Sequence, residues 1–385
     1  MTRRSGPRLD ARRLARSGAG AARGFRDRPP EGFIARDTNA EMRWDTATDL
    51  DYLVPGDRFF VRNHTTTPAI DPQTWRLSIY GDGLSGSPSP REPVSFSYHE
   101  LRQLPSVDLT CAIECTGNGR GFFATQQGTP TTGTPWTLGA IGVARWRGVA
   151  LGDLLQRAGL LSSAEEVMPV GLDAPYVDDG IDHGRVRRPL PIAKALDDVL
   201  VAYAMNGELL PPDSGFPARL VVPGWVGIAS TKWLGSIEVS RQPLTSPWNT
   251  VFYRMTGGDY PPDSPPLTTL PVKSAFELAI GARLPARRPT VLHGRSWSGT
   301  ARIRGVEVSA DGGRHWTLAR LSPPESPAAW TRWELAWTPP SPGVYELRAR
   351  ATDSAGVTQP DSVPYNSAGY HFWAVVRHPV TAVGG

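Results

Sequence analysis

One segment of this chain, GGDYPPDSPPLTTLP at residues 257–271, limits the possible fold more than any other. Proline and glycine interrupt both helices and central strands, so no regular element can run through it. Short strands and short helices alternate before the segment, without the strand–helix–strand rhythm of a parallel sheet. Only short alternating strands follow it. We therefore interpret the segment as a linker between an α+β domain, residues 41–260, and an all-β sandwich of roughly 110 residues within 261–385.

Periodicity locates the elements on either side of the linker. Apolar residues at helical spacing predict short helices at 97–106, 149–160 and 189–198. Strands are predicted at 107–113, in two parts of 56–83, and on both sides of a Pro-Gly turn in 216–240. After the linker we expect a hairpin over 301–321 and strands in 343–356 and 369–378. No catalytic pattern is visible in this last part.

The positive charge of the chain is concentrated near its start. The formal net charge is +4, but residues 1–36 hold ten arginines against three acidic residues, so the remainder is slightly acidic. A slightly acidic body argues against a nucleic-acid-binding surface. The sequence therefore predicts a disordered basic tail over residues 1–40.

The tail contains two arginine pairs, which raises the question of a twin-arginine export signal. Such a signal requires an apolar stretch of roughly 7–15 residues after the arginines, but Arg16 and Arg23 interrupt the candidate stretch. We therefore expect a cytoplasmic protein, with export to the periplasm as the alternative. No apolar run reaches the ~18 residues of a transmembrane helix, so no membrane span is expected.

Both cysteines of the chain fall in one short stretch, DLTCAIECTGNGRGFF at 108–123. If 107–113 is a strand, Cys111 and Cys115 lie about 13 Å apart, whereas a disulfide needs Cα atoms within ~7 Å. The seven histidines show no zinc-ligand cluster, and the C-x-x-C-H motif of haem attachment is absent. What remains is either two packing thiols or one functional thiol.

The residues after Cys115 favour a functional thiol there. The run from Thr116 to Gly119 consists of residues that tolerate a positive φ and let a ligand approach the backbone. Arg120 adds a planar cation suited to an oxyanion, and a thiol beside a cation tends to ionise. Because a thiolate can bind a soft metal centre, Cys115 is the candidate ligand and Cys111 a small apolar residue of the strand.

The stretch ECTGNGRGFF resembles the cysteine loop of the sulfite oxidase family of molybdenum enzymes, and in particular its bacterial sulfite and sulfane dehydrogenase branch. Further segments are similar to the family in the same order, namely FFVRNH at 59–64, residues 139–159, residues 202–239 and residues 298–316. The resemblance implies a mixed α/β molybdopterin domain followed by an immunoglobulin-like sandwich. Since that sandwich often mediates dimerisation in the family, a homodimer is expected.

The resemblance also implies molybdenum bound by one molybdopterin and one protein cysteinate, with no haem in this chain. Cys115 falls on the metal ligand. The positions that match the family's cofactor contacts are Phe60, Val61, Arg62, Asn63, His64, Asp173, Arg219, Ser230, Thr231 and Lys232. Arg219 and Lys232 can neutralise a phosphate, and Asp173 can accept from N–H groups of the pterin. On the residues alone, Arg219 as a strand-edge charge and Lys232 as a surface group are the alternatives.

The resemblance places the substrate at Arg62 and Arg120, whose guanidinium groups can bind a small oxyanion such as sulfite. Tyr253 falls near the family's active-site tyrosine, with a plain core tyrosine as the alternative. In the animal enzymes, two further arginines stand at the positions of Gly119 and Ala368. The predicted pocket is therefore less cationic than theirs, which opens alternatives to sulfite.

The predicted function is molybdenum-dependent, two-electron oxygen-atom transfer, with the oxidation of sulfite to sulfate as the favoured reaction. Electrons would pass to a separate acceptor, for which a c-type cytochrome is one candidate. A sulfane-sulfur or an S- or N-oxide substrate is the alternative within the family. A non-catalytic scaffold on the same fold is the alternative outside it.

Overall fold

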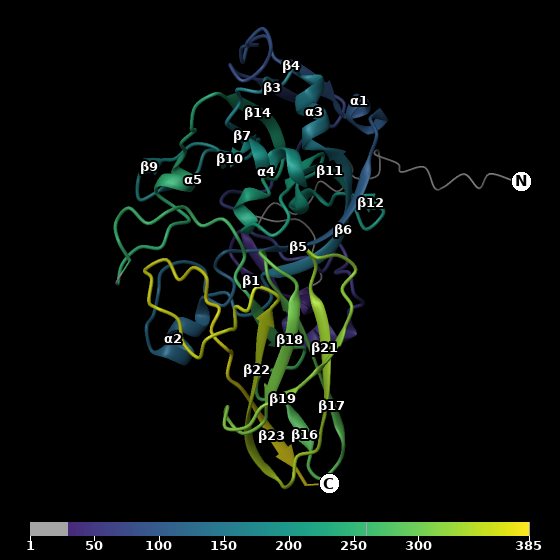
Figure 1. The fold of residues 1–385 in the computed structure, drawn as a ribbon, viewed down its shortest axis with the longest axis vertical. Helices are drawn as coiled ribbons and strands as arrows, with labels where there is room; N and C mark the ends of the chain where they lie inside the picture. Colours follow the sequence, from purple (N-terminus) through teal and green to yellow (C-terminus); the bar gives the residue numbers. More distant parts are fainter. Residues whose placement is uncertain (1–29, 259, 385) are drawn as a thin grey trace, which may run out of the picture.

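The computed structural model describes residues 30–258 and 260–384. Figure 1 shows an α+β domain above and a β-sandwich below, with the carboxyl terminus at the far end of the sandwich. Residues 1–29, on which the tail and export predictions rest, lie outside the described residues. None of the helices within the described ranges has the length and apolarity needed to cross a membrane.

The α+β domain contains two larger sheets that share one core. The first has the order β10 (Leu190–Pro191), β7 (Glu166–Gly171), β14 (Leu234–Ser240), β3 (Arg76–Tyr80) and β4 (Val94–Ser97), and β14 pairs with β3 in parallel. The second has the order β12 (Glu208–Leu209), β11 (Leu200–Met205), β6 (Ile141–Ala150) and β5 (Val107–Glu114), and β13 (Arg219–Val221) also pairs with β11. A small hairpin, β8 (Val177–Asp178) and β9 (Ile181–Asp182), projects from this domain.

The helices of this domain are short. They are α1 (Tyr98–Gln103), α2 (Gly121–Gln127), α3 (Leu151–Arg157), α4 (Ile192–Asp197) and α5 (Pro247–Thr250). The first of them begins at a capping box, because the Ser97 hydroxyl accepts from the Glu100 backbone and the Glu100 carboxylate accepts from the Ser97 backbone. The three helices predicted from periodicity are therefore present, each shorter than its segment.

The sandwich consists of two facing sheets around a second core, as predicted. One sheet has the order β15 (Lys273–Phe276), β17 (Thr290–Trp297), β21 (Thr331–Trp337) and β20 (Arg320–Ser322). The other has the order β16 (Arg283–Pro285), β23 (His378–Val383), β22 (Gly343–Asp353), β18 (Ile303–Ser309) and β19 (Thr317–Leu318). The expected hairpin over 301–321 is the antiparallel pair of β18 and β19.

Residues 33–40 differ from the prediction, which placed them in the disordered tail. They form β1 (Phe33–Arg36) and the start of β2 (Asn39–Met42), two antiparallel strands. Ala40 is fully buried and exchanges two backbone hydrogen bonds with Val61, so the end of this segment belongs to the core. The tail was predicted from the net charge of residues 1–36, and this charge gave no indication of the short hairpin at its end.

Two strand predictions were wrong in detail. The first strand predicted in 56–83 is absent, because this part contributes only an isolated bridge between Val61 and Ala40, whereas the strands predicted in 216–240 are β13 and β14. The segment 369–378 forms no strand before His378. Its apolar residues alternate because they pack against the α+β domain, where the Phe372 ring lies 5.2 Å from that of Phe123 and 5.5 Å from that of Phe122.

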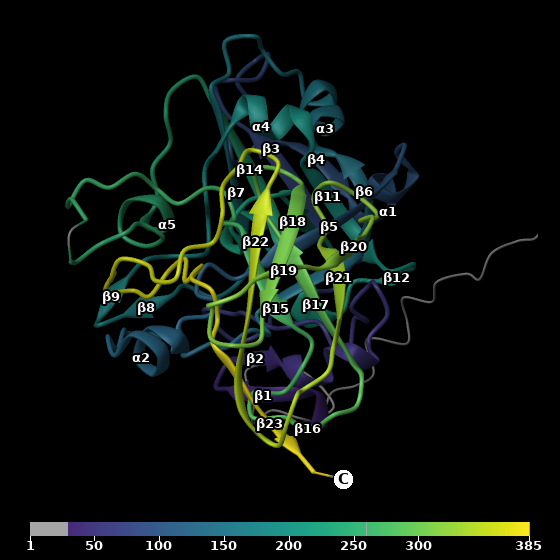
Figure 2. The ribbon, with the colours of Figure 1, turned by 60° about the horizontal axis from the view of Figure 1, so that its bottom comes forward.

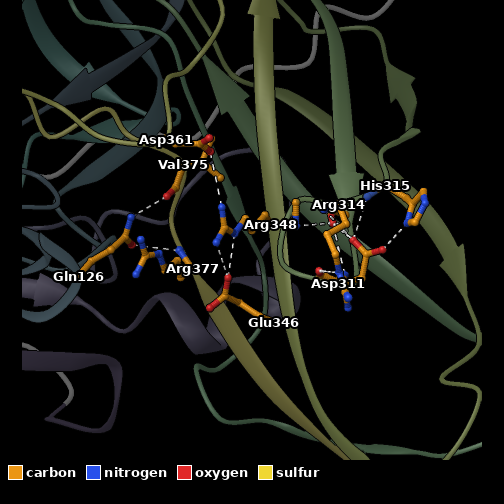
Figure 3. Close-up of polar contacts among 11 residues, drawn as sticks. Gln126, Asp311, Arg314, His315, Glu346, Arg348, Asp361, Val375 and Arg377 are labelled. Atoms are coloured by element: carbon orange, nitrogen blue, oxygen red, sulfur yellow. Dashed lines mark hydrogen bonds and ion pairs between the residues drawn. The ribbon is translucent and has the colours of Figure 1, made fainter.

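The two domains meet through this segment as well as through the sheets. Figures 1 and 2 both show the yellow chain before β23 beside α2. Gln126 of α2 donates to the Val375 carbonyl (2.8 Å) and accepts from the Arg377 backbone N–H (3.0 Å), as Figure 3 shows. Gln127 makes the same pair of bonds with Val363. These bonds fix the carboxyl-terminal end of α2, the helix that directly follows the cysteine loop.

Candidate functional site

One cavity between the two sheets of the α+β domain gathers most of the predicted site residues. Its lining combines apolar and aromatic side chains with a few polar and cationic groups, as is typical of small-molecule and cofactor sites. The predicted residues that line it are Phe60, Arg62, Asn63, His64, Cys115, Asp173, Arg219, Ser230, Thr231, Lys232 and Tyr253. They come from segments nearly 200 positions apart. Val61 and Arg120 are the predicted residues outside this lining.

Val61 lies in the core instead. Its backbone pairs with Ala40 and its side chain is fully buried, because the chain is extended there and successive side chains point to opposite sides. Asn63 is fixed in the lining, since its backbone N–H donates to the Asn39 side chain (2.9 Å). The three residues that follow Val61, namely Arg62, Asn63 and His64, all line the cavity.

Cys115 follows the last residue of β5 and lines the cavity, whereas Cys111 lies within the strand and does not. Both are free thiols. The Cys115 backbone donates to Ala140 (2.9 Å), and its carbonyl accepts from Asn118 (2.8 Å), which closes a turn directly after it. Burial raises the pKa of Cys111 to about 12, so this thiol stays protonated at neutral pH. The two cysteines thus occupy different environments, as predicted.

Arg120 folds back over its own loop. Its guanidinium donates to the carbonyls of Ala368 (2.7 Å) and Thr134 (2.9 Å), and a Cβ on Gly117 would lie 2.6 Å from it. Burial lowers its pKa, and the repulsion of Arg62 also lowers it. Arg120 therefore adds positive potential next to the cavity without being part of the lining.

Gly119 has a structural reason to be glycine. Its φ is +90°, which L side chains rarely adopt, and a Cβ there would lie 3.2 Å from the Cβ of Phe372. The side chain of an arginine would have to displace the segment that docks from the sandwich. A glycine at this position therefore allows Phe372 of that segment to pack against the cysteine loop.

The cavity lining contains two further cations, Arg219 and Lys232. Arg219 is 4 % exposed and donates to the carbonyls of Ser214 (3.0 Å) and Ser230 (2.9 Å), and burial lowers its pKa to about 9. The Lys232 ammonium donates to the Asp213 carbonyl (2.8 Å) and to the Asn63 side chain. Neither alternative from the sequence, a strand-edge charge or a surface group, applies to these two residues.

Polar atoms without partners converge on the same space. Thr116 Oγ1, Asp173 Oδ1, Ser214 Oγ and Thr231 Oγ1 are buried in the lining and make no hydrogen bond with any residue that the structure describes. Burial raises the pKa of Asp173, although its other oxygen accepts from Val186 (3.2 Å). Because buried polar groups are normally satisfied, this lining is shaped for a polar ligand with both donors and acceptors.

Aromatic side chains form the remaining wall. Tyr253 is buried at φ +58°, and its hydroxyl lies 3.4 Å from His64 Nε2. Burial raises the pKa of Tyr253, and burial with the charges of Arg62 and Lys232 lowers that of His64, so both are neutral at pH 7. The ring of Tyr370 stacks on Tyr253 with 5.3 Å between centroids.

Sequence reasoning missed Tyr370, because it lies in the segment that was read as a strand of the sandwich. It also missed several lining residues, namely Phe59, Ile113, Thr116, Val186, Asp213, Gly227, Ile228 and Trp233. Most of these lie within the segments that resemble the family, and that place was the signal that could have found them. Ile113 and Val186 lie outside those segments, and only the tertiary structure brings them to the cavity.

The electrostatics of the site favour an anion. Arg62, Arg120 and Arg219 form no ion pair with a carboxylate anywhere in residues 30–258 and 260–384. The same ranges contain no cluster of three His, Cys, Asp or Glu residues able to hold a metal ion alone. A metal at Cys115 would therefore need further ligands from an anionic cofactor, and the unpartnered polar atoms and cations fit such a group.

Comparison with known proteins agrees with this geometry. Residues 64–248 match the family model of the oxidoreductase molybdopterin binding domain, and residues 269–378 match that of the Mo-co oxidoreductase dimerisation domain. Sulfite oxidase of Gallus gallus is 38% identical over 81% of this chain and 69% of its own length. Mitochondrial sulfite oxidase of Homo sapiens is 35% identical over 85% of this chain and 61% of its own length, so this chain spans about two thirds of these relatives.

Among solved structures, the sulfane dehydrogenase SoxCD from Paracoccus pantotrophus is similar over nearly the whole chain. The TM-score is 0.74 with 26% sequence identity, and the match covers 97% of this chain and 92% of that one. The mixed α+β architecture and the sandwich are therefore shared with that structure.

Proposed function

Because the chain belongs to the sulfite oxidase family of molybdopterin-dependent oxidoreductases, we propose that it catalyses two-electron oxygen-atom transfer, with sulfite as the favoured substrate. The observation that carries the proposal is the convergence of one thiol, uncompensated cations and unpartnered polar atoms on one cavity. An inert scaffold would gain nothing from burying Arg219 without a carboxylate, since burying an unpaired charge is costly.

The lining divides into regions that suit the parts of a molybdopterin. Arg219 and Lys232 would hold its phosphate, and Asp173, Ser214 and Thr231 would hydrogen-bond the polar rings. Cys115 would supply the protein thiolate to the metal. When bound, the group supplies a molybdenum centre that accepts two electrons and exchanges an oxygen atom.

The protein's own contribution to the reaction is to bind and orient an oxyanion. Arg62 in the lining and Arg120 beside it provide the positive potential that draws the anion to the Cys115 end of the cavity. The Tyr253 hydroxyl can donate to an oxygen atom there, and the neutral His64 ring, with Nε2 3.4 Å from that hydroxyl, helps to orient it. The aromatic wall excludes water from the same place.

The electron acceptor and the assembly are part of the proposal. We expect electrons to pass to a separate acceptor such as a c-type cytochrome. We also expect a homodimer, since residues 269–378 match a dimerisation domain.

A sulfane-sulfur substrate is the second candidate, and a specific observation supports it. Position 368 is an alanine where the resemblance implies an anion-binding arginine in animal enzymes, and only its backbone carbonyl contacts Arg120, so this position adds no second cation. The pocket is less cationic as a result, and the structural neighbour is a sulfane dehydrogenase. Steady-state turnover with sulfite and with a sulfane-sulfur conjugate, using cytochrome c as acceptor, separates the two substrates.

The test of the proposal combines metal analysis with a matched pair of cysteine variants. The purified chain should contain about one molybdenum and one pterin per polypeptide, and Cys115→Ser should lower turnover by about a hundredfold or more, because it replaces the metal thiolate. Cys111→Ala, which leaves the cavity lining intact, should retain turnover. A chain without molybdenum, or a Cys115→Ser variant with full activity, would refute the proposal.

A further inference from the structure

The cysteine loop is anchored by a buried network that crosses from the sandwich. Glu114, the residue before Cys115, is 1 % exposed and accepts with both carboxylate oxygens. Its Oε1 accepts from Lys273 Nζ (2.8 Å) and Asn118 Nδ2 (2.9 Å), and its Oε2 accepts from Trp297 Nε1 (2.9 Å). Lys273 and Trp297 face each other on β15 and β17, so one edge of the sandwich supplies both donors.

The network closes around the turn that contains Cys115. Lys273 Nζ also donates to the Asn118 carbonyl (2.9 Å), and the Asn118 side chain accepts from the Ala140 backbone (3.1 Å). Asn118 is the residue whose backbone N–H donates to the Cys115 carbonyl. The position of Asn118 therefore depends on Lys273, and the turn after Cys115 depends on Asn118.

We propose that Lys273 is a positioning residue for the cysteine thiolate: its ammonium, from the sandwich, sets the geometry of the Cys115 turn through Glu114 and Asn118. This rests on the proposed role of Cys115 and goes beyond the dimerisation that the sandwich's family model describes. The charge is essential, because Glu114 is buried and would lack a counter-ion without Lys273. The sandwich is then a structural part of the metal site within each chain.

A second contact from the sandwich reaches the same loop independently. The His371 backbone N–H donates to the Thr116 carbonyl (2.9 Å), and Phe372 packs against Gly119. The glutamine contacts of α2 fix the segment that carries these residues (Figure 3). The loop is thus held from both sides by residues more than 150 positions away in the chain.

A second buried ion pair in the sandwich offers a control for this network. Arg295 and Glu277 form another fully buried ion pair, in which Arg295 also donates to the carbonyls of Ala47 (3.0 Å) and Leu50 (3.3 Å). This pair joins the sandwich to the α+β domain as well, but it makes no contact with the cysteine loop. Breaking either pair should cost folding stability, and only the Lys273 pair should change the loop.

The experiment compares Lys273→Met with Arg295→Met in the full-length chain. Hydrogen–deuterium exchange of the peptide over residues 113–120 and molybdenum content per chain are measured, together with the melting temperature. We expect Lys273→Met to speed exchange in this peptide by about tenfold or more and to lower molybdenum content. Arg295→Met should leave exchange of the peptide unchanged at a similar loss of melting temperature.

Equal exchange of the peptide in both variants, or no change in either, would overturn the positioning role. Should Lys273→Met fail to fold, Trp297→Phe removes one donor to Glu114 while an aromatic ring still fills most of the buried site, and the same comparison applies. The exchange measurement does not depend on molybdenum. A wild-type chain without molybdenum would therefore refute the proposed function. The exchange measurement would still decide whether Lys273 positions the cysteine loop.

Discussion

The arginines at the cavity and those of the sandwich differ in whether they pair with a carboxylate. In and beside the cavity, Arg62, Arg120 and Arg219 bind carbonyl oxygens and face no carboxylate among the described residues. Several arginines of the sandwich pair with carboxylates of the same or a neighbouring strand, namely Arg320 with Glu334, Arg348 with Glu346 and Arg350 with Glu307. Figure 3 shows Arg348 held between Glu346 and Asp361. Paired cations indicate a scaffold, whereas uncompensated ones indicate an anion to be bound.

The comparison predicts its largest effect at Arg219. Arg219→Met removes a buried cation from the end of the cavity proposed for the phosphate. A charge-assisted hydrogen bond to such a group is worth about 1.5–3 kcal/mol, so cofactor retention should weaken by about tenfold or more. Molybdenum and pterin per chain after dialysis provide the measurement. Cofactor retention equal to that of the wild type would contradict the proposed difference between the arginines at the cavity and those of the sandwich.

An effect on folding stability, with no direct loss of a cofactor contact, is expected at Gly119, where the two domains touch. Gly119→Ala meets both an unfavourable φ and Phe372, and we expect a loss of about 2–3 kcal/mol in the free energy of unfolding. Gly128→Ala is the control, since Gly128 has φ +71° at the end of α2 but open space around it. It should cost only about 1 kcal/mol in urea denaturation. Equal losses would show that contact with the sandwich contributes nothing at Gly119.

The folding stability of the sandwich should depend on pH. Burial lowers the pKa of His378 to about 4, against roughly 6.5 in the unfolded chain. The unfolded state therefore binds the extra proton between these values, so stability should fall as the pH drops from 6.5 to 4, by up to about 3 kcal/mol from this residue. His378→Asn should flatten the slope of melting temperature against pH, whereas His99→Asn, at an exposed position on α1, should not. An unchanged slope in His378→Asn would contradict this account.

The smallest effect belongs to the paired cations on the sandwich surface. Arg320 is 75% exposed, and its pair with Glu334 is screened by solvent. Arg320→Met should change the free energy of unfolding by about 0.5 kcal/mol or less and leave molybdenum content unaltered. A loss of cofactor in this variant, comparable with that in Arg219→Met, would remove the distinction between the two regions.

Much of the fold could be predicted from local patterns. Alternation of apolar residues located β5, β18 and β22, and helical spacing located α1. The errors have one cause. The segment 369–378 alternates like a strand because it packs between domains, and residues 33–40 were assigned by charge although they pair in the core. A local period shows that side chains alternate in burial, but not what they are buried against.

The sequence by itself determined the chemistry of this protein: a thiol at Cys115 followed by small residues and a guanidinium, and the positions of the cations that line the cavity. Only the tertiary structure decided which residues complete that site. Tyr370 stacks on Tyr253, and Lys273 reaches Glu114 across 159 positions, because the sandwich folds back onto the cysteine loop. Such contacts depend on the relative placement of two domains, and no local propensity encodes that placement.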